Sequence, residues 1–471
     1  MIQSVTLKCG MQNRIDSLNN FLAVLTVTSP SRTTTATNTT GNISAHNATK
    51  IFIGRRLVRL SGRENRHSPG DLKQFQSLSL ESKIILTQQR IKAWYESWTR
   101  FEIYDKETGK TRFVTYDTRD HGEPPLKETE WIERAWPGAV YVSFSGGIDS
   151  TVLKHMVDSM YDDVPSVFAN TGLEYPEIQR FVREIKTGKY DCFNSDVVIV
   201  RPEMRFDEVV KEYGYPIVSK TISKKVGTVL RNGKGCQTYK FFEGTAKTRQ
   251  GNPSLFNCQK WDFLCDAPFK VDYFCCEIMK KKPFKAYEAA EGRKPITGVM
   301  AYESKTREAV WTRNGCNAFD SSNPASNPLS FWTKQDVLEY IKKFDVPYCP
   351  VYGEVKTDPD GKLETTGCDR TGCIFCGFGC HLEKEPNRFQ RLKETHPRQY
   401  EYCINGGEYT DFHVFDRFGS EVKLKHCTRD QIERWISTNL GNKNFTIKRK
   451  WQPNKEGLGL GRVLDYIGVK Y

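Results

Sequence analysis

A chain of 471 residues has room for a large core, and its length fits either one α/β domain with insertions or two to three domains. Hydrophobic residues make up 38% and charged residues 27% of it, and no apolar run approaches the roughly 20 residues of a membrane helix, so we expect a globular enzyme without membrane contact. The formal net charge of +13 predicts attraction to polyanions such as nucleotides, nucleic acid or acidic partners.

The start of the chain and its cysteines both bear on compartment. The N-terminal residues do not combine the basic start, long apolar segment and small-residue cleavage site of a signal peptide, so a cytoplasmic protein is expected. In that reducing compartment fifteen cysteines are not expected to form a disulfide framework. Their uneven clustering indicates metal or redox chemistry instead.

Residues 1–77 are predicted to form a flexible N-terminal extension. The stretch 28–50 is rich in Thr, Asn and Ser and has no large apolar residue other than Ile43. Such a segment cannot bury enough surface to offset the entropy of ordering its chain.

Residues 78–138 are interpreted as an N-terminal helix followed by an inserted hairpin. Apolar residues from Leu80 to Trp98 recur at helical spacing behind a possible N-cap at Ser79. Segment 101–117 then alternates apolar and polar residues around a turn at 107–109, which is typical of a hairpin.

Residues 139–366 carry the predicted α/β core. Strands are expected at Ala139–Phe144, Ser166–Ala169 and Val197–Val200, with helices at Thr151–Tyr161 and from Pro176 onward. This alternation predicts a Rossmann-like parallel sheet with right-handed crossovers and helices on both faces.

Two segments are interpreted as insertions in this plan. Residues 218–250 hold eight Lys or Arg and a single Glu, with aromatic residues interleaved, which predicts a mobile basic segment. It suits a nucleic-acid substrate such as tRNA or DNA, since basic side chains contact phosphates and aromatic rings stack on bases; a solvated loop is the alternative. Residues 408–455, within a Cys-rich C-terminal region 367–471, contain a possible helix at Arg429–Thr438.

A phosphate-binding loop is predicted at Ser145–Ser150. It follows a strand and opens a helix, so Gly146 and Gly147 let the backbone approach a phosphate while free N–H groups and the helix dipole stabilise its charge. Ser145 and Ser150 add hydroxyl groups, Asp149 can orient Mg²⁺, and these three residues are the catalytic candidates. The alternative is a tight strand-to-helix turn that merely needs glycines.

The loop resembles the pyrophosphate loop of the ATP pyrophosphatases, and the surrounding residues resemble the phosphoadenosine phosphosulfate (PAPS) reductase family within that superfamily. The resemblance covers about residues 78–403 and the last fifteen. It implies the fold of the adenine nucleotide α-hydrolases and binding of ATP, PAPS or adenosine phosphosulfate (APS). Asn170–Glu177 is similar to the family's turn after the second strand, where the adenosine half is expected, so Thr171, Gly172 and Glu174 become binding candidates, although Asn170 replaces the usual Asp.

Two further stretches carry the resemblance. Residues 295–307 are similar to the family's Gly-x-Arg-x-x-Glu-Ser-x-x-Arg motif, which makes Gly298, Glu303 and Arg307 binding candidates, while Met300 stands where an Arg is usual. Residues 328–352 resemble the family's Trp-Thr-x-x-Asp-Val helix and its end, in which Trp332 and Val337 are interpreted as core residues.

The cysteines extend the resemblance to the iron–sulfur branch of the family. Cys275-Cys276 and Cys373-x-x-Cys376 match the arrangement that binds a [4Fe–4S] cluster there, and four thiolates are what such a cluster requires. The lysines at 280–282 would offset its charge. The run from Cys368 through Cys380 and His381 leaves open a zinc knot or a ferredoxin-like ligand set, and unligated thiols are a third reading.

Three functions remain open. The intact loop favours an enzyme that cleaves ATP to an adenylated substrate and pyrophosphate, which together with a cluster resembles enzymes that transfer sulfur to tRNA bases or to the DNA backbone. A sulfonucleotide reductase that forms sulfite needs a cysteine nucleophile near the C-terminus; residues 457–471 hold none, so only Cys403 or Cys427 could substitute. A non-catalytic nucleotide- and nucleic-acid-binding module is the third. The sulfur donor or electron-donor protein stays unidentified.

Overall fold

The computed structural model describes residues 67–119, 122–410 and 449–471, together with short pieces between 413 and 448. Most of the predicted extension 1–77 lies outside the described residues. Its last part is folded, because helix α3 (Pro69–Gln76) begins with a capping box on Ser68 and buries Leu72. The prediction of a flexible extension up to residue 77 is therefore wrong for residues 67–77. No described helix combines the length and apolarity needed to cross a membrane.

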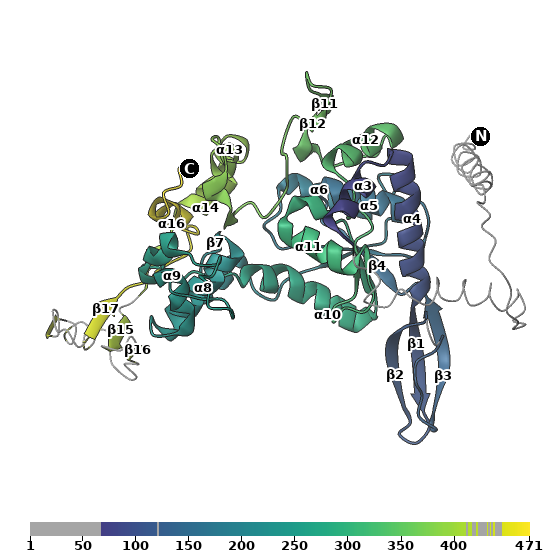
Figure 1. The fold of residues 1–471 in the computed structure, drawn as a ribbon, viewed down its shortest axis with the longest axis horizontal. Coiled ribbons are helices and arrows are strands. Elements are labelled where there is room, and N and C mark those ends of the chain that lie inside the picture. Colours follow the sequence, from purple (N-terminus) through teal and green to yellow (C-terminus); the bar gives the residue numbers. More distant parts are fainter. Residues whose placement is uncertain are drawn as a thin grey trace, which may run out of the picture. The chain divides into compact units, whose positions relative to one another are not determined.

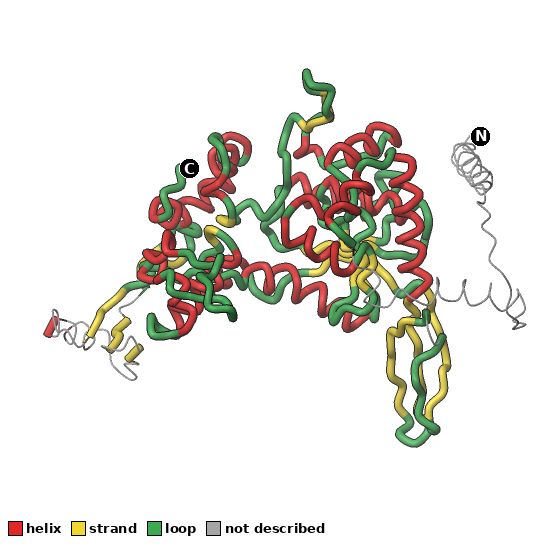
Figure 2. Tube along the Cα trace, viewed as in Figure 1, coloured by secondary structure: helices red, strands yellow, loops and turns green. Residues whose placement is uncertain are grey.

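A six-stranded sheet of order β6-β5-β4-β8-β10-β9 forms the centre of the fold (Figures 1 and 2). The neighbouring strands pair in parallel except at β9. The strands are β4 (Val140–Ser143), β5 (Ser166–Ala169), β6 (Val197–Val200), β8 (Lys294–Thr297), β9 (Asn317–Ala318) and β10 (Ala325–Ser326). Because the order runs outward from β4 in both directions, right-handed crossovers direct helices to both faces, as in Rossmann-like folds. The predicted parallel α/β fold is confirmed.

The helices of this part begin and end close to the predicted positions. They are α4 (Leu80–Ser97), α5 (Ile148–Asp158), α6 (Pro176–Lys186), α7 (Phe206–Glu212), α10 (Lys282–Glu291), α11 (Lys305–Asn314) and α12 (Lys334–Phe344). Ser79 caps α4 as predicted, and α5 starts three residues earlier than expected because Gly147 is its N-cap. Strands β4 and β5 are almost wholly buried, as strands covered on both faces must be.

The predicted hairpin is present and has a third strand. Strand β1 (Trp98–Asp105) pairs antiparallel with β2 (Lys110–Asp117) and, on its other edge, with β3 (Glu130–Pro137), which the sequence pattern did not reveal.

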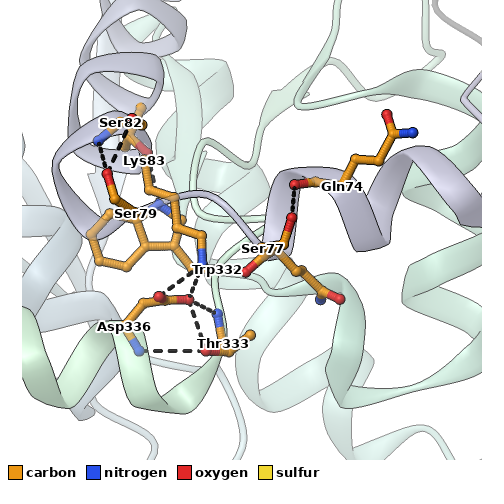
Figure 3. Close-up of polar contacts among 10 residues, drawn as sticks. Gln74, Ser77, Ser79, Ser82, Lys83, Trp332, Thr333 and Asp336 are labelled. Atoms are coloured by element: carbon orange, nitrogen blue, oxygen red, sulfur yellow. Dashed lines mark hydrogen bonds and ion pairs between the residues drawn. The ribbon is translucent and has the colours of Figure 1, made fainter.

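A buried ion pair joins α4 to α12 (Figure 3). The ammonium group of Lys83 lies 2.8 Å from both carboxylate oxygens of Asp336, and these side chains are 2% and 11% exposed. Asp336 also accepts the Thr333 N–H at 2.7 Å and completes the capping box of α12. Trp332 and Val337 are fully buried beside it, which confirms their interpretation as core residues.

A second hydrophobic core collects residues from 173 to 469. It contains the parallel pair β7 (Ile217–Val218) and β13 (Gly377–Phe378). Its helices are α8 (Lys220–Asn232), α9 (Lys240–Glu243), α13 (Arg388–Thr395), α14 (Pro397–Ile404) and α16 (Leu460–Tyr466). Where a mobile basic segment was expected, α8 thus packs Val226 and Val229 into this core.

The remaining described strands are short. They are β11 (Val355–Thr357), β12 (Leu363–Thr365), β14 (Glu408–Tyr409), β15 (His413–Asp416), β16 (Glu421–Val422), β17 (Phe445–Lys448) and β18 (Trp451–Gln452). The possible helix at Arg429–Thr438 lies largely outside the described residues.

Candidate functional site

The predicted phosphate loop lies at the point where the strand order of the central sheet reverses. Ser145–Ser150 follows β4 and opens α5, and Gly298 follows the neighbouring β8. In open α/β sheets, ligands bind at this edge, beyond the carboxyl ends of the strands. Gly146 has φ 70°, and a Cβ there would lie 2.8 Å from Ile178 Cγ2, so the turn requires glycine at that position.

A pocket of about 520 Å³ opens at this edge, and we call it the loop pocket. Its lining comes from the phosphate loop, the end of β8, the starts of α11 and α12, and the segment 369–371. The lining residues are Ser143, Ser145, Gly147, Ile148, Asp149, Ser150, Thr297, Gly298, Val299, Tyr302, Glu303, Arg307, Lys334, Tyr352, Asp369, Arg370 and Thr371. Most of the loop candidates and the motif residues Gly298, Glu303 and Arg307 are thus brought together.

Three cations surround the loop pocket, and carboxylates hold each of them. Glu303 pairs with Arg307 and accepts Arg370 Nη2 at 2.7 Å, while Lys334 pairs with Asp369. An anionic ligand can exchange places with these carboxylates, because guanidinium and ammonium groups bind phosphate oxygens equally well.

Asp149 is the carboxylate of the phosphate loop itself. Burial raises its pKa to about 6, against the lowering effect of Arg370 and Arg307. Its side chain accepts no hydrogen bond within the part of the chain that the structure describes. A carboxylate in this state is suited to receive a cation.

Tyr352 and Thr371 close the loop pocket over Gly147. The Ile148 N–H donates to the Tyr352 hydroxyl at 3.1 Å, and the hydroxyls of Tyr352 and Thr371 lie 2.6 Å apart. A Cβ on Gly147 would lie 3.3 Å from both hydroxyl oxygens. Neither residue was a sequence candidate, because Tyr352 was interpreted as packing.

The predicted adenosine-binding turn does not line the loop pocket. Thr171 donates through its hydroxyl to Glu174 at 2.6 Å and through its N–H at 3.1 Å, and Gly172 adopts φ 74° between them. Glu174 interacts with the Lys280 ammonium group, which also interacts with Cys373. Thr171, Gly172 and Glu174 therefore link the end of β5 to the cysteines.

The four cysteines of the predicted cluster lie in one neighbourhood. Cys275 and Cys276 immediately precede a π-helix (Glu277–Lys281), an element that often marks functional sites, and their Sγ atoms are 3.9 Å apart. Cys373 and Cys376 share a turn closed by a 3.1 Å backbone hydrogen bond. Each of these two thiols senses the charges of the other and of Cys276.

The charges around these thiols favour an anionic group. A hydrogen bond from the Cys275 thiol lowers the pKa of Cys276, and Lys220 and Lys280 lower it further. Burial raises the pKa of Cys373 to about 11, against the Lys280 charge. Four thiols next to two lysines form a donor set that fits a cluster whose thiolates bind separate iron atoms.

The zinc alternative needs ligands that converge on one ion, each about 2.3 Å from it for sulfur. Among the described residues, no three His, Cys, Asp or Glu side chains converge in this way. Cys380 instead donates to the Gly377 carbonyl at 3.0 Å, and Cys368 lies beside Tyr175. The geometry gives a zinc knot through Cys368, Cys380 and His381 no support.

Residues 139–378 match the family described as the phosphoadenosine phosphosulfate reductase domain. The chain belongs to this family. The matched segment contains every residue of the loop pocket and all four cysteines of the predicted cluster, and the predicted family resemblance is confirmed.

Individual relatives of this PAPS reductase domain protein are distant. The adenosine 5'-phosphosulfate reductase of Bacillus mycoides is 22% identical over 264 residues, which cover 56% of this chain and 86% of the relative. That of Bacillus cereus strain ATCC 14579 is 21% identical over 264 residues, with the same coverage. An uncharacterized protein of Methanocaldococcus jannaschii is 24% identical over 282 residues, which cover 60% of this chain and 48% of that protein. The crystal structure of PAPS reductase from Candida auris, a phosphate complex, is 16% identical, with a TM-score of 0.26, and covers 48% of this chain and 84% of that one.

Proposed function

We propose that this member of the family binds ATP in the loop pocket, releases pyrophosphate, and thereby activates a nucleic acid or nucleoside for sulfur transfer. The observation that carries the proposal is the junction of an intact Ser145–Ser150 loop with three cations, Arg307, Lys334 and Arg370, in one pocket. Backbone N–H groups and fixed cations stabilise the charge that a departing pyrophosphate carries.

The residues of the loop pocket have separable roles in this reaction. Gly147 and the start of α5 would hold the leaving phosphates, with the Ser145 and Ser150 hydroxyls beside them, 3.0 Å apart. Arg307 and Arg370 would release Glu303 and neutralise the phosphate oxygens. The adenosine half would extend from the pocket towards Thr171 and Gly172, because β5 neighbours β4 and ends at the same edge of the sheet.

Mg²⁺ fits this site through Asp149, whose buried carboxylate faces the pocket without a hydrogen-bond donor among the described residues. When bound, Mg²⁺ neutralises phosphate charge. The protein itself excludes water from the Asp149 side of the pocket and orients the phosphates through the loop backbone.

The proposed steps balance in atoms and electrons. An oxygen of the acceptor forms a bond to the α-phosphorus, the bond from that phosphorus to the α–β bridging oxygen breaks, and the electron pair leaves with pyrophosphate. A hydrosulfide ion from a sulfur donor then displaces AMP from the activated carbon. The acceptor exchanges one oxygen for one sulfur without net oxidation or reduction.

Pyrophosphate release tests this function. With ATP, Mg²⁺ and RNA or DNA acceptors, the protein is expected to release pyrophosphate, and Asp149→Asn is expected to slow release at least tenfold because the phosphates lose their counter-ion partner. Asp345→Asn is the matched control, since this exposed residue at the end of α12 adopts a left-handed conformation that Asn also accepts. No release with any acceptor, with nucleic-acid binding indifferent to ATP, would identify a non-catalytic module instead.

We further propose that Cys275, Cys276, Cys373 and Cys376 hold a [4Fe–4S] cluster, supported by their shared neighbourhood and by Lys220 and Lys280. Such a cluster supplies redox-active iron at this site. Anaerobic purification is expected to give about four iron and four acid-labile sulfide per chain, and Cys373→Ser to lose most of both. Cys192→Ser, at an exposed thiol, is expected to retain them. Zinc without acid-labile sulfide would contradict the assignment.

A sulfonucleotide reductase is the second candidate, because the relatives from Bacillus mycoides and Bacillus cereus bear that name. It requires a reactive thiol. Cys403 is fully buried in α14, and burial raises its pKa, so it is a poor nucleophile. Cys427 lies outside the described residues. Reductant-dependent sulfite from APS or PAPS, without pyrophosphate release from ATP, would favour this candidate.

A further inference from the structure

Helix α8 and the loop after α9 expose a surface rich in cations and aromatic rings. We define the α8 face as Lys220, Lys224 and Lys225 of the helix with segment 247–256 of the loop. We propose that the α8 face binds single-stranded nucleic acid. The inference rests on the proposed function, since it identifies the surface that receives a nucleic-acid acceptor.

The cations of the α8 face are largely unneutralised. Residues 218–250 contain eight Lys or Arg and one Glu. Arg231 and Lys234 pair with Asp272 and Asp266. Among the described residues, no carboxylate lies within ion-pair distance of the others, which are Lys220, Lys224, Lys225, Lys240, Lys247 and Arg249. An uncompensated row of this kind attracts a polyanion and binds it by displacing its counterions.

The loop is ordered by its own hydrogen bonds. The Thr248 N–H donates to the Asn252 carbonyl at 2.8 Å, and the Ser254 N–H donates to the Ala246 carbonyl at 2.8 Å. Asn257 Nδ2 donates to the Gly244 carbonyl at 3.0 Å. Its projecting side chains are therefore presented by a defined backbone.

Two large apolar side chains project from this ordered loop into solvent. Leu255 is 98% and Phe256 is 68% exposed. The Lys225 ammonium group donates to the Phe256 carbonyl at 2.5 Å and lies 3.9 Å above the Phe241 ring, which fixes the loop against α8. Exposed apolar residues on a fixed loop beside cations are suited to stack on bases whose phosphates the cations contact.

Position along the chain supports a nucleic-acid substrate over an acidic protein. Lys220, at the start of α8, lies beside the Cys276 thiol, and the 13 residues of the helix extend about 20 Å from it. The cations thus form a track that begins at the cysteines. Bases must be unstacked to reach Phe256, so a single strand fits the face better than a duplex.

Fluorescence anisotropy with a labelled oligothymidylate, measured without ATP, tests the inference. Lys224→Ala/Lys247→Ala/Arg249→Ala is expected to weaken binding at least tenfold and to reduce the slope of log affinity against log salt by about 2 to 3. Phe256→Ala is expected to weaken single-strand binding roughly tenfold while leaving duplex binding unchanged. Lys73→Ala/Lys106→Ala/Lys110→Ala removes the same charge from exposed lysines elsewhere and is expected to leave affinity within about twofold.

Three outcomes would overturn the inference: no salt-dependent binding, equal loss in the control triple variant, or displacement of the oligonucleotide by polyglutamate of matched charge. The last would identify the α8 face as a surface for acidic proteins. Failure here is distinguishable from failure of the proposed function. A protein that releases pyrophosphate with a nucleoside acceptor but ignores the oligonucleotide loses only this inference, and one that binds normally without releasing pyrophosphate loses only the function.

Discussion

Arg307→Ala is expected to lower the rate of ATP-dependent pyrophosphate release roughly 100-fold, the effect of removing one preorganised donor from a site of developing charge. Arg307 lies on α11, lines the loop pocket and is partly buried, so water replaces its guanidinium poorly. Arg370 is more exposed, and Arg370→Ala is expected to cost about tenfold. Arg307→Lys should fall between the two variants, because an ammonium group retains the charge but loses the two-pronged contact with phosphate.

The matched control for this series is Arg313→Ala, at an exposed position six residues further along α11. It is expected to leave pyrophosphate release within about twofold, since surface substitutions away from a site have small effects. Arg307→Ala keeps Glu303 paired with Arg370, so its thermal unfolding should match that of the parent protein. Unchanged ATP affinity and turnover in Arg307→Ala would remove the loop pocket from the reaction.

The phosphate loop could be predicted from sequence because its signals are local. Gly146 and Gly147 stand between a buried strand and a helix start, and both the turn and the helix cap form within six residues. Tyr352 and Thr371 could not be found this way. They reach Gly147 only through tertiary packing, and the bond from Ile148 to Tyr352 spans 204 positions of the chain.

Glu174 and α8 show how a correct motif can be assigned the wrong surroundings. The turn after β5 has the family pattern, yet Glu174 points to Lys280 and Cys373 because the backbone of Leu173 pairs with Ile374 at 2.8 Å. Segment 218–250 was read from its charge alone. Its buried Val226 and Val229, three residues apart, are the helical period that composition conceals.

Strand β3 was missed for a similar reason. Its residues are charged or exposed except Glu130, whose carboxylate is buried against Arg112 at 2.8 Å. The register against β1 shifts between Glu102 and Ile103, which breaks the alternation that predicts a strand. Only pairing with β1, whose Phe101 and Ile103 are buried, makes this segment extended.

Lys83→Met is expected to lower the free energy of unfolding by about 3 to 5 kcal/mol, because it leaves the buried Asp336 carboxylate without its cation. Methionine fills most of the space of the lysine stem, so a cavity contributes little to the loss. Denaturant titration followed by tryptophan fluorescence measures the change, since Trp332 is buried next to Thr333 and Asp336 (Figure 3).

The same helix supplies the control for this change. Lys92 and Glu96 form an ion pair at 3.7 Å with side chains 63% and 60% exposed, and Lys92→Met is expected to cost less than about 0.5 kcal/mol. In Lys83→Met/Asp336→Leu both buried charges are gone and only the cap of α12 is lost, about 1 kcal/mol. The double variant should therefore be more stable than Lys83→Met alone. If Lys83→Met costs no more than Lys92→Met, Asp336 is not held as a buried charge, and the junction of α4 and α12 depends on apolar packing instead.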